Sequence, residues 1–238
     1  MRFGVFAYNF PHWKTQQGLL GLSVCGFTPE VVICQDFKEL NLPSSKLRTT
    51  PYSQLMYEVD GVCEALGLKY IVSDHNSMET VALIKELKLD FGIVLGARIL
   101  PPSVIDAFGT GVINMHPGIL PDNRGLDNVK WAIINNIPQG VTVHYVNEKV
   151  DAGWLIQRYP VPVRYDDSLV ELRSRLLDAE ISALLLTLGG FERNGVKPKK
   201  DCEVLSEDVT KFRTMPPGIE KELSIRFVEY KEVHGVTV

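Results

Sequence analysis

The chain has 238 residues, of which 45% are hydrophobic and 23% are charged, and its formal net charge is −4. These values fit one large globular domain with a sizeable core, and they exclude a broad basic surface for nucleic acid. No run approaches the roughly 18 apolar residues of a membrane span. The N-terminus enters an apolar run without the features of a signal peptide, so we expect a cytoplasmic protein.

The cysteines are scattered along the chain, at Cys25, Cys34, Cys63 and Cys202. They form no CxxC pair and show no spacing typical of metal ligands. This pattern indicates reduced thiols rather than disulfides or a zinc site.

The first half of the chain alternates between strand-like and helix-like segments. Short apolar, β-branched runs predict strands at residues 3–7, 31–34, 70–72, 91–95 and 111–114. Helical periodicity is clearest at residues 53–66 and 78–87, and Ser77 is placed to cap the second helix. The order predicts right-handed βαβ units, hence an α/β fold with a Rossmann-like, doubly wound, mostly parallel sheet.

The next segment adds a strand pair and a long helix. A helix is expected at about residues 127–135, followed by strands at 140–146 and 155–163. An amphipathic helix is expected at residues 168–188, ending at the helix-breaking pair Gly189-Gly190.

The C-terminal residues predict a short extension. The Lys-Pro-Lys-Lys stretch after Val196 is typical of a linker, and strands are expected near residues 202–205 and at 224–233. We therefore expect a main domain at residues 1–195 and a short C-terminal α/β extension at 196–238.

The most polar strand exit lies at Ile113-Asn114-Met115-His116-Pro117. Asn114 and His116 are two positions apart, so an extended chain points both side chains the same way. In an open parallel sheet, ligands bind beyond the carboxyl ends of strands. An amide donor beside an imidazole can stabilise an oxyanion and handle a proton. A polar strand end that only caps a loop would have the same pattern.

A second motif follows at residues 140–146, Gly-Val-Thr-Val-His-Tyr-Val, and continues through Asp151-Ala152-Gly153 to Ile156-Gln157. Together with Ile-Asn-x-His-Pro-Gly-x-Leu-Pro at residues 113–121, it resembles the folate-dependent formyltransferase family. That family includes glycinamide ribonucleotide transformylase, methionyl-tRNA formyltransferase and the sugar N-formyltransferases. The resemblance covers about residues 68–190 and places Asn114, His116 and Asp151 in the order and spacing of the family's catalytic triad.

The resemblance implies an enzyme that moves a formyl group from 10-formyltetrahydrofolate to a primary amine, with residues 1–195 as its catalytic domain. Protonated His116 and the Asn114 amide would donate hydrogen bonds to the oxyanion. Asp151 would raise the pKa of His116 and order the group that passes the proton to the leaving nitrogen. No metal is needed, and none is suggested.

The resemblance also implies a folate pocket. The groups that would border it are Arg98, Ile99, Leu100, Val146, Asn147 and Val150. Core packing is an equally good explanation for Ile99 and Leu100. His144, inside an alternating strand, is expected to be structural.

The acceptor amine is less constrained. Glycinamide ribonucleotide transformylases carry a glycine-rich phosphate loop after the first strand, whereas residues 8–15 contain no glycine. The tRNA enzymes carry a second, basic domain, whereas only a short tail follows Lys200 here. Asn123-Arg124-Gly125 is similar to variants among the sugar N-formyltransferases, which favours a nucleotide-linked amino sugar as acceptor.

Arg124 and Lys14 are the candidate contacts to the pyrophosphate of such a substrate. Solvated surface charge explains Lys14 equally well. Three alternatives remain: a glycinamide ribonucleotide enzyme, a hydrolase that releases formate from the folate, and a binding protein without activity. We expect a small-molecule amine as the partner, with neither nucleic acid nor membrane, and a homodimer is left open.

Overall fold

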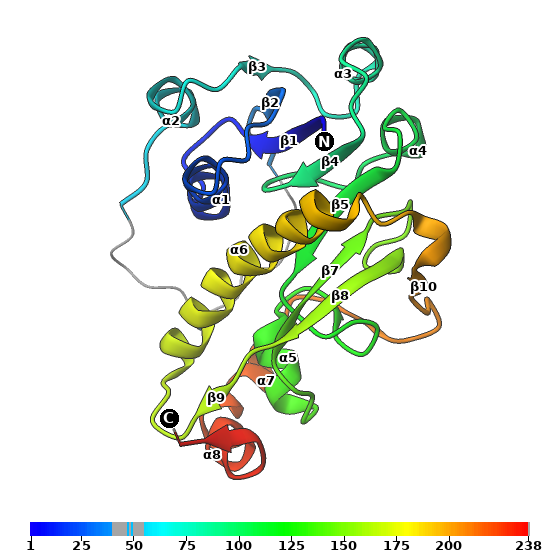
Figure 1. The fold of residues 1–238 in the computed structure, drawn as a ribbon. Coiled ribbons are helices and arrows are strands. Elements are labelled where there is room, and N and C mark those ends of the chain that lie inside the picture. The colour runs from blue at the N-terminus through cyan, green and yellow to red at the C-terminus, as the bar shows by residue number, and fades with distance from the viewer. Residues whose placement is uncertain (40–46, 48, 50–54, 238) are drawn as a thin grey trace.

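The computed structural model describes residues 1–39, 47, 49 and 55–237, which are built around an eight-stranded sheet (Figure 1). The strands lie in the order β10-β8-β7-β5-β4-β1-β2-β3. Their bounds are β1 Phe3–Tyr8, β2 Val31–Gln35, β3 Tyr70–Val72, β4 Phe91–Val94, β5 Gly111–His116, β7 Gly140–Tyr145, β8 Trp154–Pro160 and β10 Glu203–Val204. β1 to β5 pair in parallel, whereas β7, β8 and β10 pair antiparallel. The predicted α/β, mostly parallel sheet is confirmed.

Helices cover both faces of the parallel strands. One face carries α1 (Trp13–Val24), α2 (Val59–Ala65) and α6 (Leu169–Asn194), and the other carries α3 (Met78–Glu86) and α4 (Pro102–Ile105). Each face has its own core cluster, the first beneath α1, α2 and α6 and the second beneath α3 and α4. β1 contributes to both, because Val5 and Ala7 pack in the first cluster and Phe6 packs in the second. This division follows from the two-residue repeat of a strand. Within the described residues, no helix combines the length and apolar character needed to cross a membrane.

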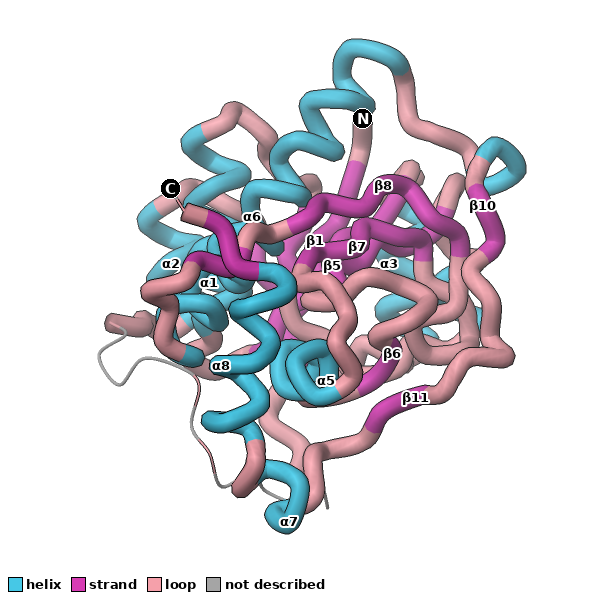
Figure 2. The backbone as a smooth tube through the Cα atoms, turned by 90° about the horizontal axis from the view of Figure 1, so that it is seen from below, coloured by secondary structure: helices cyan, strands magenta, loops and turns pink. Residues whose placement is uncertain are grey.

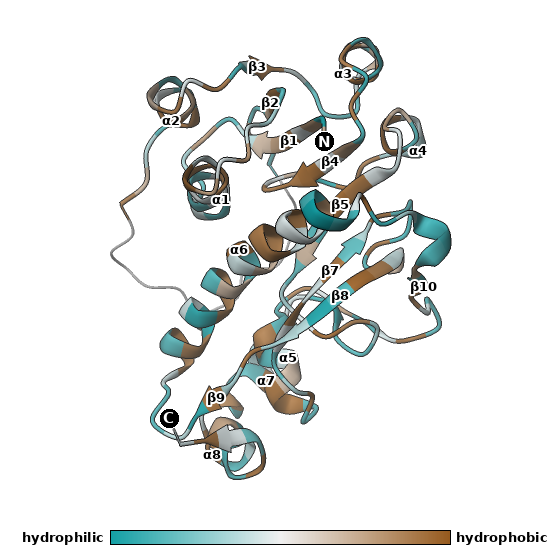
Figure 3. Cartoon of the chain, viewed as in Figure 1, coloured by the Kyte–Doolittle hydropathy of each residue, from teal (hydrophilic) through white to brown (hydrophobic). Residues whose placement is uncertain are grey.

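Two helices differ from the sequence prediction in their bounds. α2 begins at Val59, and residues 55–58 are not helical; the first two residues of the predicted 53–66 helix lie outside the described residues. α6 does not end before Gly189-Gly190 but continues to Asn194. Leu184, Leu188 and Phe191 keep one buried face across this point, and such packing outweighs a cost of about 1 kcal/mol per helical glycine. Hydrophobic and hydrophilic stretches alternate along α6 (Figure 3). Ser77 caps α3 as predicted, accepting a hydrogen bond from the backbone N–H of Thr80.

The predicted strand at residues 224–233 is wrong, because this segment forms α8 (Leu223–His234). Leu223, Phe227 and Tyr230 are buried at helical spacing, and α8 packs beside α5 (Asn128–Ile134). Tyr230 Oη donates to the carbonyl of Ile137 at 2.7 Å, which fixes the contact. The pattern was ambiguous because Ile225, exposed by 68%, also alternates with Phe227.

Short elements complete the chain. They are β6 Arg124–Gly125, β9 Val163–Arg164, the 3₁₀ turn η1 Lys199–Asp201, β11 Lys211–Phe212, α7 Pro217–Glu220 and β12 Gly235–Val236. The predicted strand at 155–163 is thus split into β8 and β9, while β10 confirms the strand expected near 202–205. β11 pairs with β6 and β12 with β9, so the tail returns to the body of the fold twice (Figure 2).

The strand order reverses at β1, which lies between β2 and β4. The loops that follow β1 and β4 therefore diverge, and such a switch point is where open α/β sheets bind ligands. β5, with the Asn114 and His116 motif, is the next strand after β4.

Candidate active site

His116, the last residue of β5, forms a buried ion pair with Asp151 from the loop between β7 and β8. Its Nδ1 lies 3.2 Å from Asp151 Oδ1, and the two side chains are 4% and 10% exposed. Asp151 Oδ2 accepts a 3.0 Å hydrogen bond from the backbone N–H of Gly125. The φ angle of Asp151 is 54°, in the left-handed region, which Asp tolerates better than most residues. Two residues far apart in the sequence thus meet with both carboxylate oxygens engaged.

The pair shifts both pKa values toward the charged forms. Burial alone would lower the pKa of His116, but the Asp151 carboxylate and the hydrogen bonds of the imidazole raise it above its ordinary value. Burial alone would raise the pKa of Asp151, but His116 and the Gly125 N–H hold it well below its usual range. The site therefore favours an imidazolium beside a carboxylate.

The motif loop holds the other side of His116. Nε2 donates to the carbonyl of Asn123 at 2.8 Å, and Asn128 Nδ2 lies 3.2 Å from the same nitrogen. Asn123 and Asn128 each donate from Nδ2 to the other's carbonyl at 2.9 Å. A Cβ atom at Gly118 would lie 3.1 Å from His116 Nε2, so glycine lets the loop close on the ring. Since Nδ1 faces a carboxylate and Nε2 faces a carbonyl, this geometry favours the doubly protonated ring.

Asn114 faces the neighbouring strand, where His144 lies directly opposite in register. Asn114 Nδ2 is 3.4 Å from His144 Nε2, and His144 Nδ1 donates to the carbonyl of Tyr145 at 3.1 Å. Burial lowers the pKa of His144 to about 4, so the neutral ring leaves Nε2 as an acceptor for the Asn114 amide. The residue expected to be structural therefore orients a predicted site residue.

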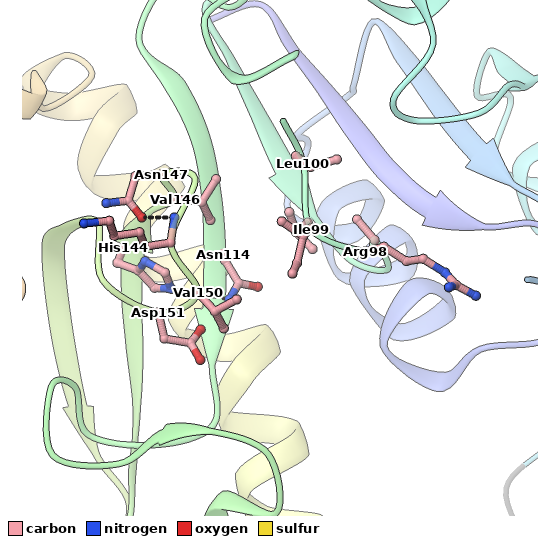
Figure 4. Close-up of a pocket in the computed structure, with 12 residues that line it drawn as sticks. Arg98, Ile99, Leu100, Asn114, His144, Val146, Asn147, Val150 and Asp151 are labelled. Carbon is pink, nitrogen blue, oxygen red and sulfur yellow. Dashed lines mark hydrogen bonds between the residues drawn. The ribbon is translucent and has the colours of Figure 1, made fainter. Parts of the chain in front are cut away.

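A cleft of about 190 Å³ opens beside these residues, at the ends of β4 and β5 (Figure 4). Besides Asn114, His144 and Asp151, its lining is Val94, Ala97, Arg98, Ile99, Leu100, Val146, Asn147, Lys149 and Val150. All six expected folate contacts lie in this lining. Ile99 is 63% exposed, which excludes core packing as its explanation, whereas Leu100 is buried in the second core cluster. His116 itself is not part of the lining.

The Arg98 side chain extends away from Asn114 and Asp151 (Figure 4). No described residue forms a hydrogen bond or ion pair with its guanidinium, so a cation is available at the rim of the cleft. The sequence pattern did not indicate Lys149 or Asn128 as site residues, and it indicated Asn123 only as part of the Asn123-Arg124-Gly125 loop. Asn128 could have been found from its place at the start of the helix after the motif loop.

The two residues expected to bind the acceptor are engaged within the protein. Lys14 Nζ donates to the carbonyl of Met115 at 2.8 Å and pairs with the buried Glu180 at 2.7 Å. Arg124 is buried and donates to the carbonyls of Val150 at 2.7 Å and Glu207 at 2.8 Å. A phosphate would have to displace these partners before either side chain could bind it.

The arrangement combines an oriented amide donor with an ion-paired imidazolium beside an open cleft. Such groups can stabilise negative charge on a bound carbonyl oxygen and pass a proton. In the described part of the chain, no group of three or more His, Cys, Asp or Glu side chains is arranged to hold a metal ion.

Comparison with known proteins identifies the family. A family model described as formyl transferase matches residues 31–188, well over half of the chain. The chain therefore belongs to the formyl transferase family, as the motif resemblance predicted.

The chain spans about half the length of the curated relatives it matches. It is 32% identical over 149 residues to the methionyl-tRNA formyltransferase of Chlorobium limicola, covering 62% of this chain and 47% of that protein. It is 30% identical over 124 residues to the phosphoribosylglycinamide formyltransferase of Haemophilus influenzae, covering 51% of this chain and 58% of that protein.

Solved structures share the fold at low sequence identity. A phosphoribosylglycinamide formyltransferase from Anaplasma phagocytophilum superposes with a TM-score of 0.64 at 22% identity, covering 87% of this chain and 96% of that one. A sugar N-formyltransferase from a Shewanella species gives 0.56 at 20% identity, covering 89% and 76%. These likenesses establish the architecture of the formyltransferase fold.

Proposed function

We propose that this chain transfers a formyl group from 10-formyltetrahydrofolate to a primary amine. One observation carries the proposal: the oriented Asn114 amide and the His116–Asp151 ion pair meet beside one cleft. Membership of the formyl transferase family supports it, because the reaction needs a donor for the formyl oxygen and a route for one proton.

The cleft fits the ring end of a folate. Drug-sized ligands occupy about 300–1,000 Å³, so a cleft of about 190 Å³ suits a bicyclic ring and leaves the rest outside. Val94, Leu100 and Val146 supply apolar lining. The backbone N–H groups of residues 98–100 make no hydrogen bond to a described residue, so they are free to meet the edge of a heterocycle. Arg98 would meet the folate's carboxylates at the rim.

When bound, the folate would supply an activated formyl group on a nitrogen leaving group. The second Nδ2 hydrogen of Asn114 would donate to the formyl oxygen, and loss of one such donor costs about 3–4 kcal/mol of transition-state stabilisation. His116 would act as the second donor, after exchanging its hydrogen bond to Asn123 for one to the ligand. Asp151 would keep His116 charged and order the group that carries the amine proton to the leaving nitrogen.

We further propose that the acceptor is the amino group of a nucleotide-linked amino sugar. An aromatic cluster at the carboxyl ends of β1 and β2 supports this choice: Tyr8 and Phe10 stack at 4.9 Å, and Phe37 meets Phe10 edge-on at 5.7 Å. Phe37 is 70% exposed, so a nucleobase could stack there. Tyr8 Oη donates to the carbonyl of Ala97 at 3.0 Å, which joins the cluster to the cleft.

The span from the cluster to the catalytic strand favours an extended acceptor. β2 is separated from β5 by β1 and β4. Three strand steps of about 4.8 Å each give roughly 14 Å, longer than one sugar ring. A sugar joined through a pyrophosphate to a base can reach both ends.

One assay separates the candidate activities. The protein is incubated with 10-formyltetrahydrofolate alone, with glycinamide ribonucleotide, and with a panel of nucleotide-linked amino sugars, and mass spectrometry detects a gain of one formyl group. We expect formylation of an amino sugar. Formate release without any amine would indicate a hydrolase, and turnover of glycinamide ribonucleotide alone would contradict the sugar proposal.

Because the proposed roles fall on protein side chains, EDTA is expected to leave the turnover unchanged. Treated and untreated protein are compared at equal folate concentration. Activity that EDTA removes and zinc restores would contradict these roles.

A further inference from the structure

The tail segment Leu205–Phe212, here named the strap, crosses the loop that carries Asp151. Leu205 donates from its backbone N–H to the carbonyl of Gly153 at 2.9 Å. Further along, Lys211 and Phe212 pair in parallel with β6 as β11 (Figure 2). The strap is therefore attached at two points, one at Gly153, just beyond Asp151, and one at β6.

Arg124 links the strap to that loop through hydrogen bonds to both segments. Its Nη2 donates to Val150 O at 2.7 Å, while Nη1 donates to Glu207 O at 2.8 Å. Ser206 O and Val209 O lie at 3.4 and 3.5 Å from Nη1. The planar fork of a guanidinium can hold two chain segments at once, which a lysine ammonium does less well.

Gly125, the residue after Arg124, contacts the ion pair directly. The Gly125 N–H donates to Asp151 Oδ2, while Oδ1 faces His116. Gly125 has a φ of 100°, and a Cβ atom there would lie 2.0 Å from Phe212 O. The position of this donor is therefore set by direct contact with the strap.

We propose that Arg124 and the strap are a positioning device for Asp151, and through it for the charge of His116. Arg124 fixes Val150, the neighbour of Asp151, and the strap fixes Gly125, the donor to Asp151. This inference rests on the proposed function for its catalytic meaning, but not for its effect on the ion pair. It also assigns the tail a part in the site, which no feature of its sequence indicated.

The first test is Arg124→Lys, with two independent readouts. NMR titration of His116 in the full chain should show a lower pKa than in the native protein, because a displaced carboxylate no longer offsets burial. In turnover assays kcat should fall about tenfold to a hundredfold, because displacing a catalytic group by about 1 Å can cost about a hundredfold. The acceptor KM should change by less than about twofold, because Arg124 does not touch the acceptor in this proposal.

These readouts distinguish the possible failures. A raised acceptor KM with native kcat and native His116 pKa would make Arg124 the phosphate contact that the sequence suggested. Lower thermal stability with unchanged kcat and unchanged pKa would reduce it to a structural residue. A native protein that formylates no amine would remove the proposed function, while the NMR titration would still test the positioning.

Gly125→Ala tests the strap itself, and Gly218→Ala is the matched control on the same tail. No atom lies within 4 Å of a Cβ at Gly218, so that substitution should be silent. The Cβ at position 125 should force β11 away, speed tryptic cleavage after Lys211, and lower the pKa of His116. Native cleavage and a native His116 pKa in Gly125→Ala would overturn the proposal.

Discussion

His116 and His144 lie on the paired strands β5 and β7, and both are almost completely buried, yet their pKa values shift in opposite directions. Burial opposes the charged form of both rings. His116 lies where the strand ends and two loops meet, so Asp151 can reach its Nδ1. His144 lies inside the sheet, where its nitrogens meet a backbone carbonyl and the Asn114 amide. The two rings are about equally buried, so the difference in pKa comes from the Asp151 carboxylate, which the fold places against His116 and not against His144.

The same difference separates the two roles that we propose for these residues in catalysis. A charged imidazole can donate from both nitrogens, whereas a neutral one offers one donor and one acceptor. His116 is suited to stabilise developing negative charge, and His144 is suited to hold the Asn114 amide in place. Substitutions at either histidine, or at the partner of His116, should therefore have different effects.

The largest effect is expected for His116→Ala. Loss of the imidazolium should lower kcat/KM by at least about a hundredfold, the usual contribution of a positioned acid or base. His234→Ala, on α8, is the matched control and should keep native turnover. Circular dichroism and thermal unfolding verify that both variants fold. A folded His116→Ala variant with near-native turnover would refute the mechanism.

Asp151→Asn should cost about a hundredfold in kcat/KM by removing the partner that keeps His116 charged. Burial then dominates and lowers the pKa of His116. In the native protein, activity is expected to be lost as the pH rises through the raised pKa of His116. In the variant this loss should begin at a lower pH, and a pH profile of kcat/KM measures the shift. If the alkaline limb of this profile, where activity falls as the pH rises, were unchanged in the variant, the deprotonation of His116 would not be the cause of that fall.

The ion pair should also appear in the pH dependence of folding. The raised pKa of His116 contributes stability that is present below about 6.5 and is lost as the pH rises through the folded-state pKa. The lowered pKa of Asp151 contributes stability that is present above about 3.9 and is lost as the pH falls. The difference in free energy of unfolding between native protein and Asp151→Asn should therefore be largest between about pH 4 and 6.5. Urea unfolding of both proteins at several pH values measures this difference. A difference that does not change with pH would argue against the ion pair.

The smallest effect is expected at His144. His144→Gln keeps an acceptor for the Asn114 amide and should lower kcat by less than about tenfold. His144→Phe removes the acceptor and should lower kcat further. Neither substitution should move the alkaline limb, because the pKa of His144 is about 4 and its ring is already neutral there. A shift of that limb in either variant would mean that the two histidines titrate together.

Much of the site could be predicted from the chain itself. Asn114 and His116 stand at the end of an apolar run, and Asp151 follows a second strand-like motif; both signals lie within a few neighbouring residues. The family model confirms the family, and the fold confirms the parallel sheet. The partners of Arg124 could not be predicted, because the carbonyls it meets come from Val150 and from the strap, segments distant in the sequence.

The sequence by itself determined the elements whose periodicity is unambiguous: the buried parallel strands, the capped helix α3 and the motif spacing. Only the tertiary structure decided that α8 is a helix, that α6 continues through Gly189-Gly190, and that His144 lies within hydrogen-bond distance of the Asn114 amide. The physical reason is the same in each case. Local pattern depends on neighbouring residues, whereas packing faces and charge partners are supplied by residues that only the folded chain brings into contact.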